Sequence, residues 1–224
     1  MVPSGPSNKP PGTPSQVLNN ALLKKGCRVL AAADPCLGRW IKAIGPLSFR
    51  PRPERFHSLC RAIIGQQLSN AAARTIHRRF LSLFAPARNP TPVRLLKLKP
   101  RLLRSCGLSE KKAFYLRELA AAFDGGHLQR RRLSKMGDEE IIELLIPLPG
   151  IGRWTAEMFL IFCLGRPDIF SIGDLALRAG AEKVAGRKLK DRELLARAAG
   201  WAPWRSVASL YLWKIAHWKD APPG

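Results

Sequence analysis

Apolar residues recur three and four positions apart along most of the chain, in segments rich in Ala, Leu and Arg. This spacing is that of a helix with one buried face, because residues i, i+3, i+4 and i+7 lie on the same side of an α-helix. The alternating Val, Ile, Thr and Tyr that mark strands between turn residues are scarce. The pattern therefore predicts an all-α fold of about ten helices.

Helices are expected where this spacing is sustained between breakers such as Pro and Gly. The segments that fit are 15–33, 37–44, 53–64, 70–84, 92–97, 100–106, 109–123, 138–145, 153–164, 174–184, 191–199 and 203–218. Three of the expected starts carry Ser109, Asp138 and Asp191, whose side-chain oxygens can accept the free N–H groups of a first turn.

The first fifteen residues, "MVPSGPSNKPPGTPS", contain five prolines and no apolar stretch. They predict a disordered tail over 1–14 and not a secretory signal. Because the later connections are short, we expect a single domain over 15–224 in which two lobes flank a cleft. One lobe is expected from about 55–165, and the other from about 15–54 together with 166–224.

The composition indicates a soluble protein. The longest apolar run, 158–164, is far shorter than the roughly 18 residues of a membrane-spanning helix. We expect a cytoplasmic protein, or a nuclear one in a eukaryote, with no membrane partner. The cysteines are odd in number and form no CxxC pair, so reduced and mostly buried thiols are expected in place of disulfides or a zinc site. They are Cys27, Cys36, Cys60, Cys106 and Cys163.

The net charge of the chain narrows the class of binding partner. The chain has 38 Lys and Arg against 16 Asp and Glu, a formal net charge of +22. Residues 1–109 contain two acids, Asp34 and Glu54, and carry +17, while residues 110–224 carry +5. Such a field attracts polyanions, of which nucleic acid is the commonest. The alternative is a charge that serves only solubility.

The stretch "ELLIPLPGIGRWTAEMFLIF" predicts one helix that ends near Leu145, a tight turn, and a second helix that opens at Arg153. Gly150 and Gly152 leave no side chain between the turn and an approaching surface. The N–H groups that open the second helix point outward at the positive end of its dipole and form an anion site. Ile151 between the glycines can turn inward and hold the two helices together.

This arrangement is a helix-hairpin-helix, which on DNA grips a backbone phosphate without reading the sequence of bases. Alone, it fits an ordinary αα-hairpin with glycine caps equally well. The net charge of +22 favours DNA binding.

The hairpin resembles that of the helix-hairpin-helix (HhH-GPD) DNA glycosylases. "LPGIGRWTA" is similar to their "LPGxGxxTA", and Asp174 lies twenty residues beyond Trp154, near the spacing of their aspartate. "WAPWRSVASLYLWKIAHW" and "FHSLCRAIIGQQLSNAAA" are similar to two further segments of the 3-methyladenine DNA glycosylase II branch. The resemblance covers about 53–218.

The resemblance implies that Asp174 is the catalytic residue. Breaking an N-glycosidic bond builds positive charge on the deoxyribose, and a nearby carboxylate stabilises that charge and can orient the attacking water. The local sequence "SIGDLALR" supports a second interpretation, in which Asp174 caps the next helix. Geometry permits both roles.

The resemblance also implies a pocket for the flipped base. An indole face suits cationic alkylated purines by stacking and cation–π attraction. The expected pocket residues are Trp154, Trp218, Met158, Leu175 and Gln66. The other tryptophans of the C-terminal half, at positions 201, 204 and 213, are expected in the core.

The remaining DNA contacts are implied in the same way. Gln67, with Leu68 beside it, stands where the family inserts a wedge into the hole left by the flipped base; alternatively, Gln66 and Gln67 only cap the loop between two helices. The hairpin residues expected to hold the DNA backbone are Leu148, Gly150, Ile151, Gly152, Arg153 and Thr155. The carbonyls of Leu148 and Gly150 could also hold a structural monovalent cation, and no catalytic metal is expected.

The chain departs from the family pattern in several places. Too few residues precede "GQQLS" for the extra β domain of the bacterial archetype, so a minimal all-helical form is expected. Gly173 replaces the first of two adjacent aspartates, and Met158 and Leu175 replace tyrosines. No cysteine follows Cys163, so no iron-sulfur cluster is expected, nor any other cofactor.

The sequence therefore predicts a monomeric, monofunctional DNA glycosylase that hydrolyses alkylated purines from double-stranded DNA and leaves an abasic site. Trp154 occupies the position where strand-cutting relatives carry a lysine, so no lyase activity is expected. Two alternatives are a non-catalytic protein that binds damaged DNA and a glycosylase for deaminated or oxidised bases.

Overall fold

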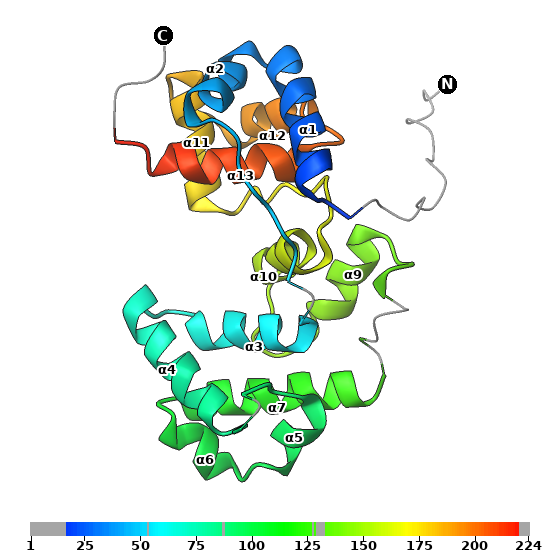
Figure 1. Cartoon of the computed structure of the whole chain (residues 1–224), viewed down its shortest axis with the longest axis vertical. Helices are drawn as coiled ribbons and strands as arrows, with labels where there is room; N and C mark the ends of the chain where they lie inside the picture. The colour runs from blue at the N-terminus through cyan, green and yellow to red at the C-terminus, as the bar shows by residue number, and fades with distance from the viewer. Residues whose placement is uncertain (1–16, 53, 87, 127, 129–132, 220–224) are drawn as a thin grey trace, which may run out of the picture.

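The computed structural model describes residues 17–52, 54–86, 88–126, 128 and 133–219, and the described residues fold into helices joined by short connections, without a strand (Figure 1). The prediction of an all-α fold is confirmed. The helices are α1 (Asn20–Ala33), α2 (Pro35–Ile44), α3 (Arg55–Gly65), α4 (Asn70–Ser82), α5 (Pro92–Lys97), α6 (Pro100–Ser105), α7 (Glu110–Asp124), α9 (Asp138–Leu145), α10 (Arg153–Phe159), the π-helix η1 (Leu160–Leu164), α11 (Leu175–Ala185), α12 (Asp191–Ala199) and α13 (Arg205–Ala216).

The helices gather in two lobes (Figure 1). Helices α3 to α7 form one, and α1 and α2 join α11, α12 and α13 in the other, so the N-terminal helices lie beside the last helices of the chain. Helices α9 and α10 lie between the lobes. The segments before α1 and α3 are fixed to the end of the α10–η1 unit, because Leu18 N–H donates to Gly165 O at 2.7 Å and Arg52 N–H to Phe162 O at 2.8 Å.

Several helix boundaries differ from the prediction by a few residues, and two have a clear local reason. Helix α1 begins at Asn20 and not near 15, because the Asn19 side chain accepts the N–H of Leu22 and caps the helix there; positions 15 and 16 lie outside the described residues. The last helix begins at Arg205 and not at 203, since Trp204 has non-helical dihedral angles. The expected single helix over 153–164 becomes α10 followed by the wider turns of η1.

The cap predictions are partly wrong. Ser109 caps α7 as predicted and accepts the N–H of Lys112. Asp138 and Asp191 are instead the first residues inside α9 and α12. Gly137 and Lys190 precede these helices, and each donates its N–H to a glutamate three residues later, Glu140 and Glu193, at 2.5 and 2.8 Å. The glutamates satisfy the helix starts from within the first turn.

The core runs through both lobes and includes the tryptophans that were expected there. Trp201 is fully buried, and Trp204 and Trp213 pack against the core. Helices α11 and α13 cross closely at Gly180, where a Cβ atom would lie 2.2 Å from the carbonyl oxygen of Leu212. All five cysteines are free thiols, and Cys60, Cys106 and Cys163 are buried, as predicted.

A histidine pair joins α3 to α4. The rings of His57 and His77 stack with centroids 5.0 Å apart, and their Nε2 atoms lie 2.8 Å from each other. Burial lowers the pKa of both rings, and that of His77 falls to about 4 with His57 and Arg61 adding to the effect. None of the described helices is both long and apolar enough to cross a membrane.

Candidate active site

Helices α9 and α10 and the turn between them form the predicted helix-hairpin-helix. Ile151 is buried between the helices and donates its N–H to Leu148 O at 3.0 Å. Gly150 has φ +83°, and a Cβ atom there would lie 2.3 Å from the Tyr115 ring on α7. Glycine is therefore required at position 150 both for its backbone conformation and for the close packing of Tyr115.

The outer side of the turn is open. Gly152 has no heavy atom within 4 Å of where its Cβ would be. The N–H groups that open α10 lack acceptors within the helix and lie at the positive end of its dipole, which suits a phosphate. Arg153 at this end is shared between Glu139, at 2.6 Å, and Glu157, at 3.0 Å. Thr155 is buried.

Asp174 and Trp154 are in direct contact. The indole N–H of Trp154 donates to Oδ2 of Asp174 at 2.8 Å. The other carboxylate oxygen, Oδ1, accepts the N–H groups of Ala176 and Leu177, both at 2.9 Å, and so caps α11. The Asp174 residue is 7% exposed, whereas Trp154 is 49% exposed. The carboxylate is thus held on both oxygens beside an accessible aromatic face, and the cap and the site coexist.

A cavity of about 850 Å³ lies beside Trp154, between α3, the start of α7 and α10. Of the predicted site residues, Gln66, Gln67, Gly150, Trp154, Thr155 and Met158 line it. Phe159 and Phe162 add aromatic surface, and four basic side chains also line the cavity: Arg52, Arg61, Lys111 and Lys112. The cavity is therefore part aromatic and part cationic. Asp174 does not line it, but is hydrogen-bonded to Trp154, which does.

The predicted wedge segment follows α3 and faces the same cavity. Gln67 has φ +56°, an uncommon conformation for a residue with a side chain. The Gln66 side chain donates to Gly150 O at 2.6 Å and ties this loop to the hairpin. Lys112 on α7 donates from Nζ to Ile64 O at 2.9 Å and to Gln66 O at 2.6 Å. The loop is held from two sides, and Leu68 beside it is exposed.

Two predicted pocket residues lie elsewhere. Leu175 is 81% exposed at the start of α11 and does not line the cavity. Trp218 packs edge-on against Trp40, with ring centroids 6.1 Å apart, and does not line the cavity either. The structure brings Trp154, Met158 and Gln66 together and leaves these two residues outside the cavity wall.

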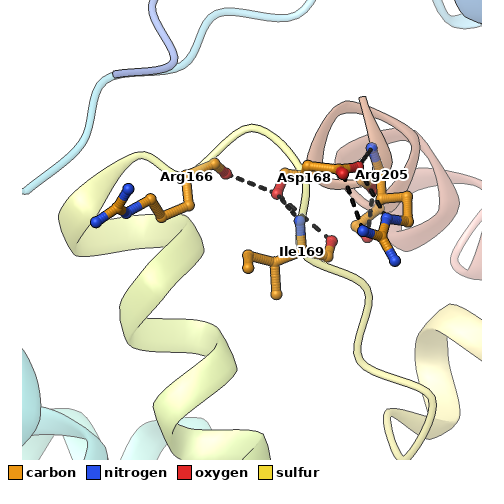
Figure 2. Close-up of polar contacts among 6 residues, drawn as sticks. Arg166, Asp168, Ile169 and Arg205 are labelled. Carbon is orange, nitrogen blue, oxygen red and sulfur yellow. Dashed lines mark hydrogen bonds and ion pairs between the residues drawn. The ribbon is translucent and has the colours of Figure 1, made fainter. Parts of the chain in front are cut away.

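The segment that leads to Asp174 is anchored to α13 (Figure 2). Arg205 forms a two-pronged ion pair with Asp168, at 2.8 and 2.9 Å. Ser206 accepts the N–H of Ile169 at 2.9 Å and donates to Arg166 O at 2.7 Å. Arg205 and Ser206 of the C-terminal motif thus hold the segment that leads to Asp174.

Sequence reasoning missed four residues of the site: Lys112, Tyr115, Glu157 and Ser171. Lys112 and Tyr115 lie three residues apart on α7, and they support the wedge loop and the hairpin turn respectively. Only Glu157 had a local signal, since it is the one acidic residue in the apolar run "TAEMFLIF". A charge on a buried helix face indicates a buried partner.

The two carbonyl groups that were expected to hold a monovalent cation each accept a hydrogen bond from the protein. Leu148 O accepts from Ile151 N–H, and Gly150 O accepts from Gln66. Across the described ranges, no group of three or more His, Cys, Asp or Glu side chains is arranged to hold a metal ion.

The fold and this site define a helix-hairpin-helix protein with a buried aspartate that is hydrogen-bonded to a tryptophan of the cavity wall. Residues 60–206 match the HhH-GPD superfamily of base excision DNA repair proteins, and the chain belongs to this family. The resemblance drawn from its motifs is confirmed.

Individual relatives agree. DNA-3-methyladenine glycosylase 1 of Schizosaccharomyces pombe is 33% identical over 205 residues, which cover 85% of this chain and 86% of that protein. The crystal structure of a DNA-3-methyladenine glycosidase from Bacillus halodurans matches with a TM-score of 0.81 and 33% identity, over 90% of this chain and 93% of that one. A 3-methyladenine DNA glycosylase of S. pombe, solved in complex with abasic DNA, matches with a TM-score of 0.74 and 32% identity, over 85% and 95% of the two chains.

Proposed function

We propose that this protein, like the hydrolytic DNA-3-methyladenine glycosylases that it resembles, removes alkylated purines of the 3-methyladenine and 7-methylguanine type from duplex DNA. The observation that carries the proposal is the hydrogen bond between Trp154 and Asp174 at the edge of the cavity. The same helix, α10, carries both Trp154 and the phosphate-binding end of the hairpin. Helix α10 therefore fixes the distance between the phosphate-binding N–H groups and the Trp154–Asp174 pair.

Each part of the site has a role in the proposed reaction. The open N–H groups beside Gly152 hold a backbone phosphate. The target base cannot be reached inside the duplex, so it rotates out into the cavity, where the indole of Trp154 stacks on it. The loop that carries Gln67 and Leu68 is positioned to fill the space that the base leaves.

Asp174 supplies the chemistry. As the bond to the base lengthens, positive charge grows on the sugar, and a fixed carboxylate stabilises it more in the transition state than in the ground state. Alkylated purines are cationic and leave readily, so no general acid is required. Water completes the hydrolysis and an abasic site remains. No lysine stands at position 154 to form a covalent adduct with the sugar, so the strand stays uncut.

The test uses duplexes that each hold one lesion, with mass spectrometry to detect the free base. The wild-type protein should release alkylated purines, and Asp174→Asn should retain lesion-DNA affinity while base release is lost. Asp191→Asn, a change of an exposed carboxylate on α12, is the matched control. Full turnover by Asp174→Asn would refute the role of Asp174. Lesion binding without any released base, even by wild-type protein, would favour a non-catalytic damage-binding protein.

A further inference from the structure

We propose that Glu157 is a positioning residue for Asp174, and that it acts through the hydroxyl of Ser171. This inference rests on the proposed function of Asp174 and adds residues that the proposed chemistry does not itself use. Glu157 lies on α10 one helical turn after Trp154 and is 6% exposed.

A buried carboxylate is costly unless its oxygens are bonded, and both oxygens of Glu157 are. Oε1 accepts from Arg153 Nε at 3.0 Å. Oε2 accepts from the fully buried Ser171 hydroxyl at 2.5 Å. One carboxylate therefore connects the first residue of α10 with the segment that precedes Asp174.

The bond from Ser171 to Glu157 is one of two parallel hydrogen bonds between α10 and the segment that ends at Asp174. Trp154 bonds to Asp174, and Glu157 bonds to Ser171, so residues three apart on α10 hold residues three apart on the facing segment. On a helix, positions three apart lie on the same face. The facing segment is itself closed into a turn, because Asp174 N–H donates to Ser171 O at 3.1 Å. The catalytic turn is thus fixed to α10 at both of its ends.

The same chain of bonds reaches the DNA-binding end of the hairpin. Arg153 bonds to Glu157 and also to Glu139 on α9. The position of α10 on a DNA phosphate and the position of Asp174 are therefore linked by contiguous polar contacts between described side chains. Glu157 is the member that joins the two.

Loss of the Ser171 hydroxyl should release one end of the turn without removing the cap on α11 or the bond to Trp154. A small displacement of a catalytic group can cost on the order of 100-fold in rate. We therefore expect Ser171→Ala to slow single-turnover base release roughly 10- to 100-fold. Glu157→Gln should act in the same direction, because an amide offers one acceptor oxygen to two donors, Arg153 and Ser171.

The matched control is Ser209→Ala. Ser209 is also a fully buried serine, and it also gives one hydrogen bond, to Arg205 O at 2.8 Å on its own helix. Thermal melting of all three variants establishes that each is folded at the assay temperature. Ser209→Ala should release base at the wild-type rate.

A binding measurement separates positioning from a general structural effect. Two duplexes are compared, one with a neutral tetrahydrofuran abasic-site analogue and one with a pyrrolidine analogue whose ring nitrogen carries the charge that the sugar develops. A well-placed Asp174 favours the charged analogue. The wild-type protein and Ser209→Ala should show the same preference, and Ser171→Ala and Glu157→Gln should lose roughly 10-fold of it or more while binding the neutral analogue as before.

The outcomes are distinct. If Ser171→Ala matches Ser209→Ala in rate and in preference for the charged analogue, Glu157 does not position Asp174. If Ser171→Ala weakens binding to both analogues equally, the role is structural and the inference is wrong. If the wild-type protein releases no base and shows no preference, the proposed function itself fails.

Discussion

Trp154 donates its indole N–H to the same carboxylate, Asp174, that caps helix α11 through its other oxygen. The aspartate therefore cannot rotate without breaking a bond to the hairpin helix or opening the first turn of α11. In the proposed reaction such a fixed carboxylate is electrostatically preorganised, because its charge is already in place when the transition state forms.

Trp154→Phe keeps an aromatic face for the base but removes the donor to Asp174. Because Oδ2 then loses its protein partner, the carboxylate should be less well placed, and base release should fall by roughly 10-fold, the equivalent of one modest hydrogen bond. Single-turnover kinetics on a 7-methylguanine duplex would measure it. The control is Trp213→Phe, which changes a half-buried core tryptophan. An unchanged rate for Trp154→Phe would mean that the indole N–H does not matter.

Gly150→Ala should lower the stability of the fold, whereas Gly152→Ala should lower only the affinity for DNA. At position 150 the added methyl group meets the Tyr115 ring at 2.3 Å and the φ of +83° is strained, so unfolding should become easier by about 1–3 kcal/mol. At position 152 the methyl group meets no protein atom. That variant should melt like the wild type but bind DNA more weakly, because the methyl group occupies the approach of the phosphate. Melting curves and equilibrium DNA binding together test the pair, and a wild-type melting curve for Gly150→Ala would contradict the packing described.

Lys112→Met should loosen the wedge loop. It leaves Ile64 O and Gln66 O without the ammonium group that holds them, and hydrogen bonds to a charged group contribute about 1.5–3 kcal/mol each. We expect the flipped state to be less populated. A 2-aminopurine base beside the lesion reports flipping by its fluorescence. Lys97→Met, an equal charge change on an exposed position of α5, is the control; equal signals from the two variants would show that only charge matters.

Stability should decrease in acid through the His57 and His77 pair. Burial lowers the pKa of His77 from 6.5 to about 4, so between these values the unfolded chain binds more protons than the folded chain. This contribution to the free energy of unfolding is therefore complete above about pH 6.5 and declines as the pH falls toward 4. Urea titrations between pH 7 and 4 measure the slope. The slope should be shallower in His77→Gln, and an identical slope would exclude the pair as its source.

The motifs predicted those parts of the site that depend on local sequence. The positive φ of Gly150 in the turn "PGIG" is a requirement that acts within a few residues. The spacing from Trp154 to Asp174 reflects the length of one helix and one loop. Trp218 and Leu175 were also expected in the pocket, and neither lines the cavity. Whether a side chain faces a cavity depends on how distant helices pack, and the contact of Trp218 with Trp40 joins residues far apart in the chain.

The residues that support the site could not be predicted from the sequence for the same reason, since they act through contacts between distant helices. Lys112 bonds to carbonyls more than forty positions away, and nothing near it in sequence marks that use. Tyr115 is required only because Gly150 happens to lie against its ring. Helix ends were predicted to within a few residues. The bounds of α9 and α12 were correct, although a glutamate inside the first turn replaced the expected aspartate cap.

The ion pair of Arg205 with Asp168 has a consequence for how the enzyme is made. The hairpin and Asp174 are complete when the ribosome has passed position 174, but the bonds that secure their connecting segment come from α13, thirty residues later. During synthesis the residues of the hairpin and Asp174 thus leave the ribosome before the residues that secure their connecting segment. A chain that ends before Arg205 lacks the bonds from α13 to Asp168 and Ile169.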